Sequence, residues 1–511
     1  MPIIRALLML ALAVGAASAQ EKTLRMAVSA ADVGSLDPHR SVAGQDKAVF
    51  AQVFNALVRL PPGSADLARI EPDLAERWES SPDGLVWTFT LRRGVQFHHG
   101  YGELTADDVA HSLTRAADAK RSSFASDYAA VKAVEAVDAH TVRITLAQPV
   151  PSLLGLVVDV HGGLVVSAKA DRELGEGFKL KPVGTGAFAV AGHEPKTSTT
   201  LAAHKGYFRR APVIDRIVVR YLPSDQTREL ALVAGELDLI TGRRDQRWVE
   251  RVRALPGMTV DVFESGELLA FYVNTRKPPL DDLRVRQALM HAIDRDEIRR
   301  YVGADVTTLA NAVVPPGSLG ELPGPWPYAY DPARARALLA EAGHPGGVTL
   351  RSVSSSNTAL LPLMELAQAQ LRKAGITLDI DVVDHPTYHV KIREDLSALT
   401  VYGAWRFPVA DSYLTQFHHS RASVGRPTAV TNFSHCDVAD AEIDAARADT
   451  DRARQIAAWH EAQRKLAAAA CAIPLYTLKM VWVRSNRLDY GYRLDGALGL
   501  APPITERTAL R

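Results

Sequence analysis

The sequence predicts an α/β protein of several layers. Two observations lead to this prediction: short segments in which apolar and polar residues alternate, as in strands, and longer segments in which apolar residues recur every three or four positions, as in helices. The two kinds of segment are interspersed along 511 residues, of which 47% are apolar and 23% charged. This composition is that of an average soluble globular protein. The length suggests roughly two to four domains.

The charges of the chain are balanced. Lysine and arginine number 59 against 58 acidic residues, which gives a formal net charge of +1. A chain without a basic excess has no electrostatic reason to bind nucleic acid or an anionic membrane surface. We therefore expect neither partner.

The N-terminal residues 1–19 have the pattern of a secretory signal peptide. Arg5 supplies a positive charge, residues 6–14 are apolar, and Ala17-Ser18-Ala19 is a cleavage site of small residues. The apolar stretch is too short to span a membrane. These residues predict export, and in a Gram-negative bacterium the destination would be the periplasm.

Five segments have the pattern of strands. Residues 85–91, LVWTFTL, alternate with the period of two that a half-buried strand requires, and residues 142–146 and 376–382 do the same. Residues 216–221 and 268–273 are short apolar runs suited to buried strands. The strands are spread along the chain rather than gathered in one part of it.

Helices are predicted between these strands. Thr105 followed by Asp108 resembles a capping box, and Asp331 before Pro332 offers a capping oxygen ahead of a proline at the first helical position. Residues 360–371 and 456–470 carry apolar stripes with helical spacing. Gly343 and Gly375 follow two of these segments and predict where they end.

The only cysteines are Cys436 and Cys471. In an exported chain they could form one disulfide, since the compartment is oxidising, or remain two buried thiols. The sequence leaves both alternatives open, because it does not show how far apart the two residues lie. Neither cysteine lies in a metal-binding or nucleophile motif.

Motifs of catalysis are absent from the sequence. There is no G-x-S-x-G, no phosphate-binding loop, no H-E-x-x-H and no dinucleotide fingerprint. The chain also has several histidine groups, which could in principle hold a metal: His98-His99, His385 with His389, and His418-His419 near His435. His385 and His389 are four positions apart, but without a third ligand in the sequence surface histidines are the simpler interpretation. We expect no enzyme, no cofactor and no metal.

A series of motifs follows in a fixed order along most of the chain. They are LDPH at 36–39, EPDLAE at 71–76, RGVQFH at 93–98, LTADDV at 104–109, PVGTGAF at 182–188, NT at 274–275, DLRVRQAL at 282–289, AIDR at 292–295 and AIPLY at 472–476. This set resembles the family 5 extracytoplasmic solute-binding proteins, the peptide, nickel and opine receptors of ABC importers. The resemblance extends from about residue 24 to residue 493.

The resemblance implies a fold, namely the two-lobed clamshell of periplasmic binding proteins of type II, in the large three-domain variant with a two-crossing hinge. Lobe 1 would comprise residues 20–274, with an inserted domain at about 45–176, and lobe 2 residues 275–480. Residues 481–511 would return to lobe 1. The crossings would lie near Asn274 and Leu478.

The resemblance also implies a mechanism and partners. The lobes of such a receptor close about the hinge over a peptide-like or anionic small solute. The closed form then docks on an inner-membrane ABC permease, and separate ATPase subunits hydrolyse ATP. A monomer is expected, because each lobe must present one docking face.

One segment departs from the family pattern where the ligand is expected. In peptide-binding members, a strand of lobe 2 carries an aspartate that pairs with the ammonium of the peptide, and the matching position here is Arg406. An arginine favours carboxylate or phosphate, which predicts either a solute with an anionic group or peptides that bind in a different manner. Alternatively, Arg406 points to solvent or pairs with an internal acid. The segment contributes as candidate ligand-binding residues Tyr402, Gly403, Ala404, Trp405, Arg406, Phe407 and Asp411.

Further candidates match by position. Asp32, Val33 and Gly34 correspond to a lobe 1 segment that contacts ligand backbones, and Phe124 and Tyr128 to an aromatic stretch that closes one end of the cleft. For each aromatic residue, packing in the core is an equal alternative. Two other function classes stay open beside the main one, namely a metal (nickel) or haem receptor of the same fold and a secreted enzyme.

Overall fold

The structure is a computed structural model that describes residues 21–41, 43–150, 153–158, 162–425 and 431–511. The predicted signal peptide lies outside these residues. Among the described residues, no helix has the length and apolar character needed to cross a membrane.

A mixed sheet of nine strands runs through the middle of the molecule. Its order is β16-β12-β17-β11-β1-β10-β9-β8, and β13 also pairs with β17. The strands are β1 Thr23–Val28, β8 Phe188–Glu194, β9 Ser198–Ala203, β10 Arg216–Tyr221, β11 Leu239–Thr241, β12 Met258–Val273, β13 Thr307–Leu309, β16 Leu399–Ala404 and β17 Ala472–Ser485. The long antiparallel strands β12 and β17 pair over most of their length and connect the two sides of the sheet.

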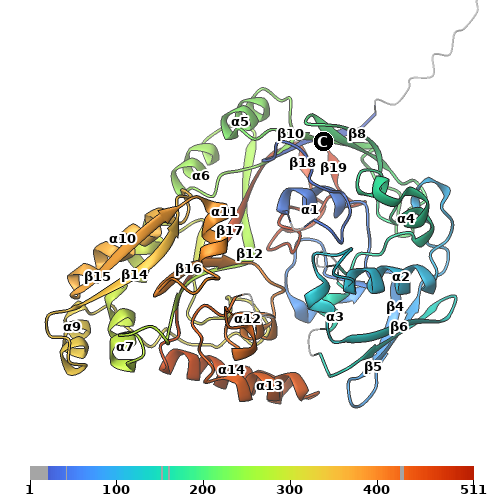
Figure 1. The fold of residues 1–511 in the computed structure, drawn as a ribbon. Coiled ribbons are helices and arrows are strands. Elements are labelled where there is room, and N and C mark those ends of the chain that lie inside the picture. Colours follow the sequence, from blue (N-terminus) through green and yellow to red (C-terminus); the bar gives the residue numbers. More distant parts are fainter. Residues whose placement is uncertain (1–20, 42, 151–152, 159–161, 426–430) are drawn as a thin grey trace, which may run out of the picture.

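The buried apolar residues form two large cores, one on each side of these strands. The buried residues of the first core come from two stretches of the chain, between Leu24 and Phe263 and between Met480 and Ile504. Those of the second core lie between Leu268 and Tyr476. We call the parts around them the first half and the second half. They lie on opposite sides of β12 and β17 (Figure 1). A third, smaller core packs helices α5 Asp225–Val233 and α6 Gln246–Arg253 on β11 and β17.

The first half carries an additional antiparallel sheet of order β4-β5-β7-β6. Its strands are β4 Ala75–Ser80, β5 Val86–Leu91, β6 Val131–Asp138 and β7 Thr141–Leu146, and the short strands β2 Val58–Arg59 and β3 Glu71–Pro72 precede it. Helices α1 Gly44–Phe50, α2 Ala106–Ala117, α3 Leu153–Leu156 and α4 Ala168–Leu174 surround this region. The C-terminal strands β18 Leu488–Asp489 and β19 Ala509–Leu510 also lie in the first half, near the position of the C-terminus in Figure 1.

The second half packs helices on the parallel pair β14 Val348–Ser355 and β15 Ile376–Val383 and on the end of the main sheet. Its helices are α7 Leu283–Ala292, α8 Arg295–Val302, α9 Pro332–Glu341, α10 Leu361–Lys373, α11 His385–Lys391, α12 Ala410–Phe417, α13 Asp440–Ala448 and α14 Arg452–Ala468. The two cores support the predicted division of the chain at about residues 274 and 480, which stays a prediction.

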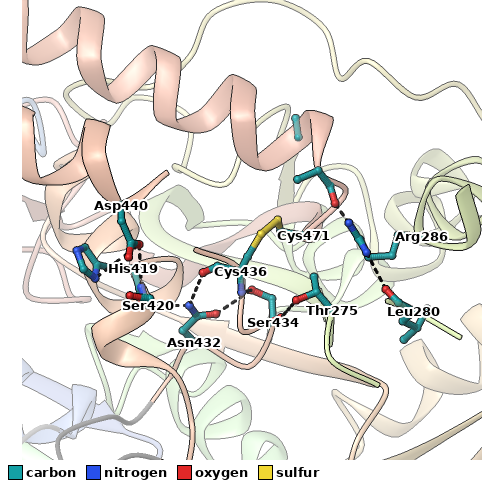
Figure 2. The surroundings of a disulfide bond; sticks show 12 residues. Thr275, Leu280, Arg286, His419, Ser420, Asn432, Ser434, Cys436, Asp440 and Cys471 are labelled. Atoms are coloured by element: carbon teal, nitrogen blue, oxygen red, sulfur yellow. Dashed lines mark hydrogen bonds and ion pairs between the residues drawn. A yellow bond between two sulfur atoms is a disulfide. The ribbon is translucent and has the colours of Figure 1, made fainter. Parts of the chain in front are cut away.

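Cys436 and Cys471 form a disulfide, with their Cα atoms 6.0 Å apart. The bond joins the segment before α13 to the residue before β17, as Figure 2 shows. Asn432 donates to the Cys436 carbonyl at 3.0 Å, and Thr275 donates through its hydroxyl to Ser434 at 2.9 Å. Of the two alternatives that the sequence leaves open, the structure shows the bridge.

Candidate functional site

A cavity of about 1320 Å³ lies between the two halves. The first half contributes Gln45 of α1, residues 241–247 after β11, and Trp482. The second half contributes Arg300 and Tyr301 of α8, residues 357–360 with Pro362 and Leu363 near the start of α10, three residues of α11, and Tyr402 and Gly403 of β16. Glu267 and Leu269 of β12 and Leu478 and Met480 of β17 connect the two walls. The cavity thus depends on segments from across the sequence.

Arginines exceed carboxylates around this cavity. Five arginines line it, Arg228, Arg243, Arg244, Arg247 and Arg300, against the three carboxylates of Asp225, Asp245 and Glu267. All three carboxylates are engaged by the protein. Asp225 pairs with Arg228 and, at 3.5 Å, with Arg243; Asp245 accepts the backbone N–H of Trp248 at 2.8 Å; and Glu267 pairs with Arg244 at 2.6 Å.

The cationic wall is placed by a turn between β11 and α6. Arg228, which is 1% exposed, donates to the carbonyl oxygens of Thr241 and Pro223, both at 3.0 Å, and so ties this turn to α5. Burial lowers the pKa of Arg228 in spite of the carboxylate of Asp225. Asp245 caps the N-terminus of α6, and Arg243 and Arg247 on either side of it are exposed. The turn therefore presents guanidinium groups that match a carboxylate.

The wall of the second half is polar but largely uncharged. Helix α11 begins after its cap Asp384 and directs His385 and His389 to the cavity, next to Tyr402 of β16 and Asn357. The Oγ of Ser355 and the Nδ1 of His385 lie 2.9 Å apart. Imidazole, amide and phenol groups can hydrogen-bond hydroxyl or amide groups of a solute. The cavity thus combines a cationic wall with a wall of neutral hydrogen-bonding groups.

Part of the predicted site segment 402–407 lines this cavity, and another part contacts the first half. Tyr402 and Gly403 line the cavity, whereas Ala404 is 5% exposed and pairs with Leu268 in the sheet. Trp405 stacks against Lys47 of α1, whose Nζ lies 4.1 Å from the ring centroid. The ring of Phe407 covers Gly155 of α3 so closely that a Cβ on that glycine would lie 2.0 Å from Cε1 of the ring.

Arg406 is held by groups of the protein itself. Its Nε donates to Gln416, its Nη1 donates to the Trp405 carbonyl at 2.9 Å, and its guanidinium carbon lies 5.1 Å from the centroid of the Phe417 ring. Asp127 of the first half faces it: burial raises the pKa of Asp127, and Arg406 and Lys47 oppose that rise. Arg406 is not among the cavity residues. The cations that face the cavity are instead those of residues 243–247 and Arg300.

The other predicted site residues also lie outside the cavity lining. Asp32 is near His193, with Oδ1 3.6 Å from Nε2, and the backbone of Gly34 donates to Asp46 at 3.1 Å. Val33, Phe124 and Tyr128 are buried at 8%, 5% and 2% exposure, and the hydroxyl of Tyr128 donates to the Leu156 carbonyl at 2.7 Å. Asp411 is 6% exposed and lies 3.4 Å from Nε of Arg447. A role for these residues in binding stays a prediction.

Sequence reasoning missed the arginines of the cavity. The available signal was the run GRRDQR at 242–247, which directly follows strand β11, LIT. Of the histidine groups, only His385 and His389 line the cavity. His418 is buried, with its pKa lowered by burial to about 3, and His435 pairs with Asp395 at 2.9 Å. Within the described part of the chain, no three metal-ligating side chains come together.

Known proteins share this fold and this length. Residues 69–424 match the model of the bacterial extracellular solute-binding proteins, family 5. The di/tripeptide-binding protein 2 of Pseudomonas aeruginosa is 30% identical over 90% of each chain. The structure of the binding protein MoaA of A. tumefaciens R10 in complex with mannopinic acid is 47% identical, covers 96% of this chain and 100% of its own, and has a TM-score of 0.82.

The periplasmic binding protein DppA of Helicobacter pylori, solved with the peptide STSA, is 28% identical, covers 96% of this chain and 98% of its own, and has a TM-score of 0.78. The match to the family model extends over more than half of the sequence, and these relatives cover it almost from end to end. The chain belongs to the family 5 bacterial extracellular solute-binding proteins, the receptors that serve ABC transporters.

Proposed function

We propose that this chain is an exported receptor for a carboxylate-bearing solute of the opine type, which it captures between its two halves and delivers to a membrane permease. The observation that supports the anionic solute most directly is the excess of positive charge around the cavity, whose described lining holds five arginines and three carboxylates. Arg228, Arg243 and Arg244 pair with two of these carboxylates, and Arg300 lies 3.8 Å from Asp294, outside the lining. The structural relative with 47% identity was solved with mannopinic acid, an opine. The neutral wall around Tyr402 would bind the hydroxyl groups of such a solute.

Export is the second part of the proposal. Residues 1–19 have the pattern of a cleaved signal peptide, and the bridge between Cys436 and Cys471 fits an oxidising compartment such as the periplasm. The partners would be an inner-membrane permease and its ATPase subunits. We expect the receptor to act as a monomer, with each half offering one docking face.

Isothermal titration of the purified mature protein with mannopinic acid tests the proposal, with di- and tripeptides as the comparison. We expect the opine to bind at least ten times more tightly than dipeptides. The double variant Arg247→Ala/Arg300→Ala should weaken opine binding about ten- to a hundredfold, because a hydrogen bond to a charged group contributes about 1.5–3 kcal/mol.

The matched control is Arg493→Ala, whose side chain is 88% exposed and lies outside the cavity lining. Its affinity should equal that of the wild type. Tight binding of dipeptides without binding of opines or other carboxylic acids would contradict the proposal. An unchanged affinity in the double variant would contradict the assignment of the solute to the cationic wall.

A further inference from the structure

Two imidazole rings meet at the cavity wall. His385 and His389 are one helical turn apart on α11, and their Nε2 atoms lie 3.2 Å from each other. The ring planes are inclined by 70°. The second nitrogen of His385, Nδ1, lies 2.9 Å from the hydroxyl of Ser355. The two rings thus contact each other, and His385 also contacts Ser355.

This geometry limits the number of protons that the pair can hold. At 3.2 Å, one Nε2 can donate its proton to the other, which must then accept. Two protonated rings would bring two donors and two positive charges together, which is unfavourable. The contact between the two Nε2 atoms therefore has room for one added proton, which lies between the two rings.

The charges around the pair come from several elements. In and next to α11 these are the cap Asp384, Lys391 and Arg393. Lys391 pairs with Asp381 of β15 at 3.1 Å. On β16, Tyr402 contacts the ring of His389, and the polar group on β14 is Ser355. The charged groups that share the cavity with the pair are Arg228, Arg243, Arg244, Arg247 and Arg300 with Asp225, Asp245 and Glu267.

We infer that His385 and His389 jointly take up one proton when an anionic solute enters the cavity, so that the pair helps to select anions and the affinity rises as the pH falls. This inference rests on the proposed function, since it needs an anion in the cavity. Without a solute, burial and the guanidinium of Arg393 oppose a further positive charge at His389. A bound carboxylate reverses this effect and makes the protonated pair a partner of the solute.

The free protein supports the direction of this effect. The pKa of His389 is lowered from 6.5, first by burial and then by the charges of His385 and Arg393. Before the solute arrives, these effects favour the neutral form of His389. An anion that raises this pKa draws a proton from the solvent, and the uptake is largest around and below pH 6.5.

Titration calorimetry measures the proton uptake directly. Mannopinic acid is titrated into the metal-free protein at pH 6 and pH 8, in MES, ACES and Bis-Tris buffers that differ in ionisation enthalpy. At pH 6 the buffer dependence should give uptake of up to about one proton, and at pH 8 close to none. The affinity should rise by up to about tenfold per pH unit as the pH falls between these values.

The double variant His385→Gln/His389→Gln keeps hydrogen-bonding side chains that cannot become charged. It should still bind the solute at pH 8, lose the proton uptake at pH 6 and show a nearly constant affinity. His344→Gln, outside the cavity lining, is the control and should behave as the wild type. In the solute-free protein, His385→Gln should raise the pKa of His389 measured by NMR, because the second imidazole lowers it.

The outcomes separate the two proposals. Binding at both pH values without proton uptake, or uptake that persists in the double variant, would overturn the histidine inference and leave the proposed function intact. If no carboxylic acid binds at either pH, the proposed function fails and the inference fails with it. An unchanged His389 pKa in His385→Gln would show that the two rings do not titrate as a pair.

Discussion

Individual residues of the LDPH segment at 36–39 serve the packing of the first half. Arg115 of α2 is 4% exposed and donates to Asp37 at 2.9 Å and to His39 at 2.8 Å. The other nitrogen of His39 lies 2.9 Å from the Leu164 carbonyl. Asp171 accepts a hydrogen bond from Arg121 at 2.6 Å. Burial alone would raise the pKa of Asp171, but His111, Arg115 and Arg121 together lower it. The motif thus holds the N-terminal segment against α2 and α4.

Three buried histidines predict that acid destabilises the protein. Burial lowers the pKa of His39 to about 4 and those of His98 and His418 to about 3, from an ordinary 6.5. Below pH 6.5 the unfolded chain binds protons at these residues that the folded chain does not. The free energy of unfolding should therefore fall as the pH drops from about 6.5 toward 4, by about 1.4 kcal/mol per pH unit for each histidine.

Urea unfolding at pH 7.5, 6.5, 5.5 and 4.5 measures this slope. His418→Gln should make the slope shallower by the share of one histidine, whereas His344→Gln should leave it unchanged. A stability that is constant from pH 6.5 to pH 4.5 would contradict the assignment of these three rings as neutral.

At the scale of elements, local patterns predicted much of the fold. The segments 85–91, 142–146 and 216–221 form β5, β7 and β10, and the capping pattern at Thr105 begins α2, where the Thr105 N–H donates to Asp108 at 3.0 Å. Asp331 caps α9 as expected. These features depend only on residues close in sequence, which is why the sequence alone reveals them.

Strand β12 shows what local patterns do not predict. The apolar run predicts a strand over residues 268–273, but β12 extends from Met258 to Val273. Its pairing with β17 shifts register between Phe263 and Glu267, and Gly266 in this bulge has φ of +76°. The bulge interrupts the alternation of apolar residues, so the two parts of the strand do not read as one element.

The disulfide should stabilise the helical hairpin of α13 and α14. These helices lie within the 35-residue separation that Cys436 and Cys471 close. Cys436→Ser/Cys471→Ser should lower the free energy of unfolding by about 2–4 kcal/mol, since the bridge restricts the unfolded chain. Urea unfolding with and without a reductant checks this. The reductant should lower the stability of the wild type and not of the variant; an equal effect on both would contradict the prediction.

At the scale of the whole molecule, the site could be predicted only in part. Of the segment that the family resemblance indicated, Tyr402 and Gly403 line the cavity, and their role in binding stays a prediction. Three of the five cavity arginines, Arg243, Arg244 and Arg247, belong to residues 241–247, about 160 residues earlier in the chain. Only the pairing of β11, β17 and β12 brings that segment opposite β16, and no local pattern encodes this arrangement.

The contact between Phe407 and Gly155 predicts how closure can be blocked. Because a Cβ at position 155 would lie 2.0 Å from the ring, Gly155→Leu should force the two halves apart. We expect solute affinity to fall at least tenfold and the radius of gyration with solute, measured by small-angle X-ray scattering, to exceed that of the wild type. Gly177→Ala is the control, because nothing lies within 4 Å of its added Cβ. Wild-type affinity in Gly155→Leu would show that this contact is dispensable.

The pairing of β12 with β17 has a consequence for motion. These adjacent antiparallel strands are hydrogen-bonded on both sides of the bulge, from Met258 opposite Ser485 to Tyr272 opposite Ala472. Both strands pass from one half to the other at the bulge, so pulling the halves apart would stretch both strands, whereas bending at the bulge would keep the ladder on either side of it. We therefore expect the halves to move relative to each other mainly by bending at this point. A receptor restricted in this way searches few unproductive arrangements, so little conformational entropy is lost when it closes on its solute.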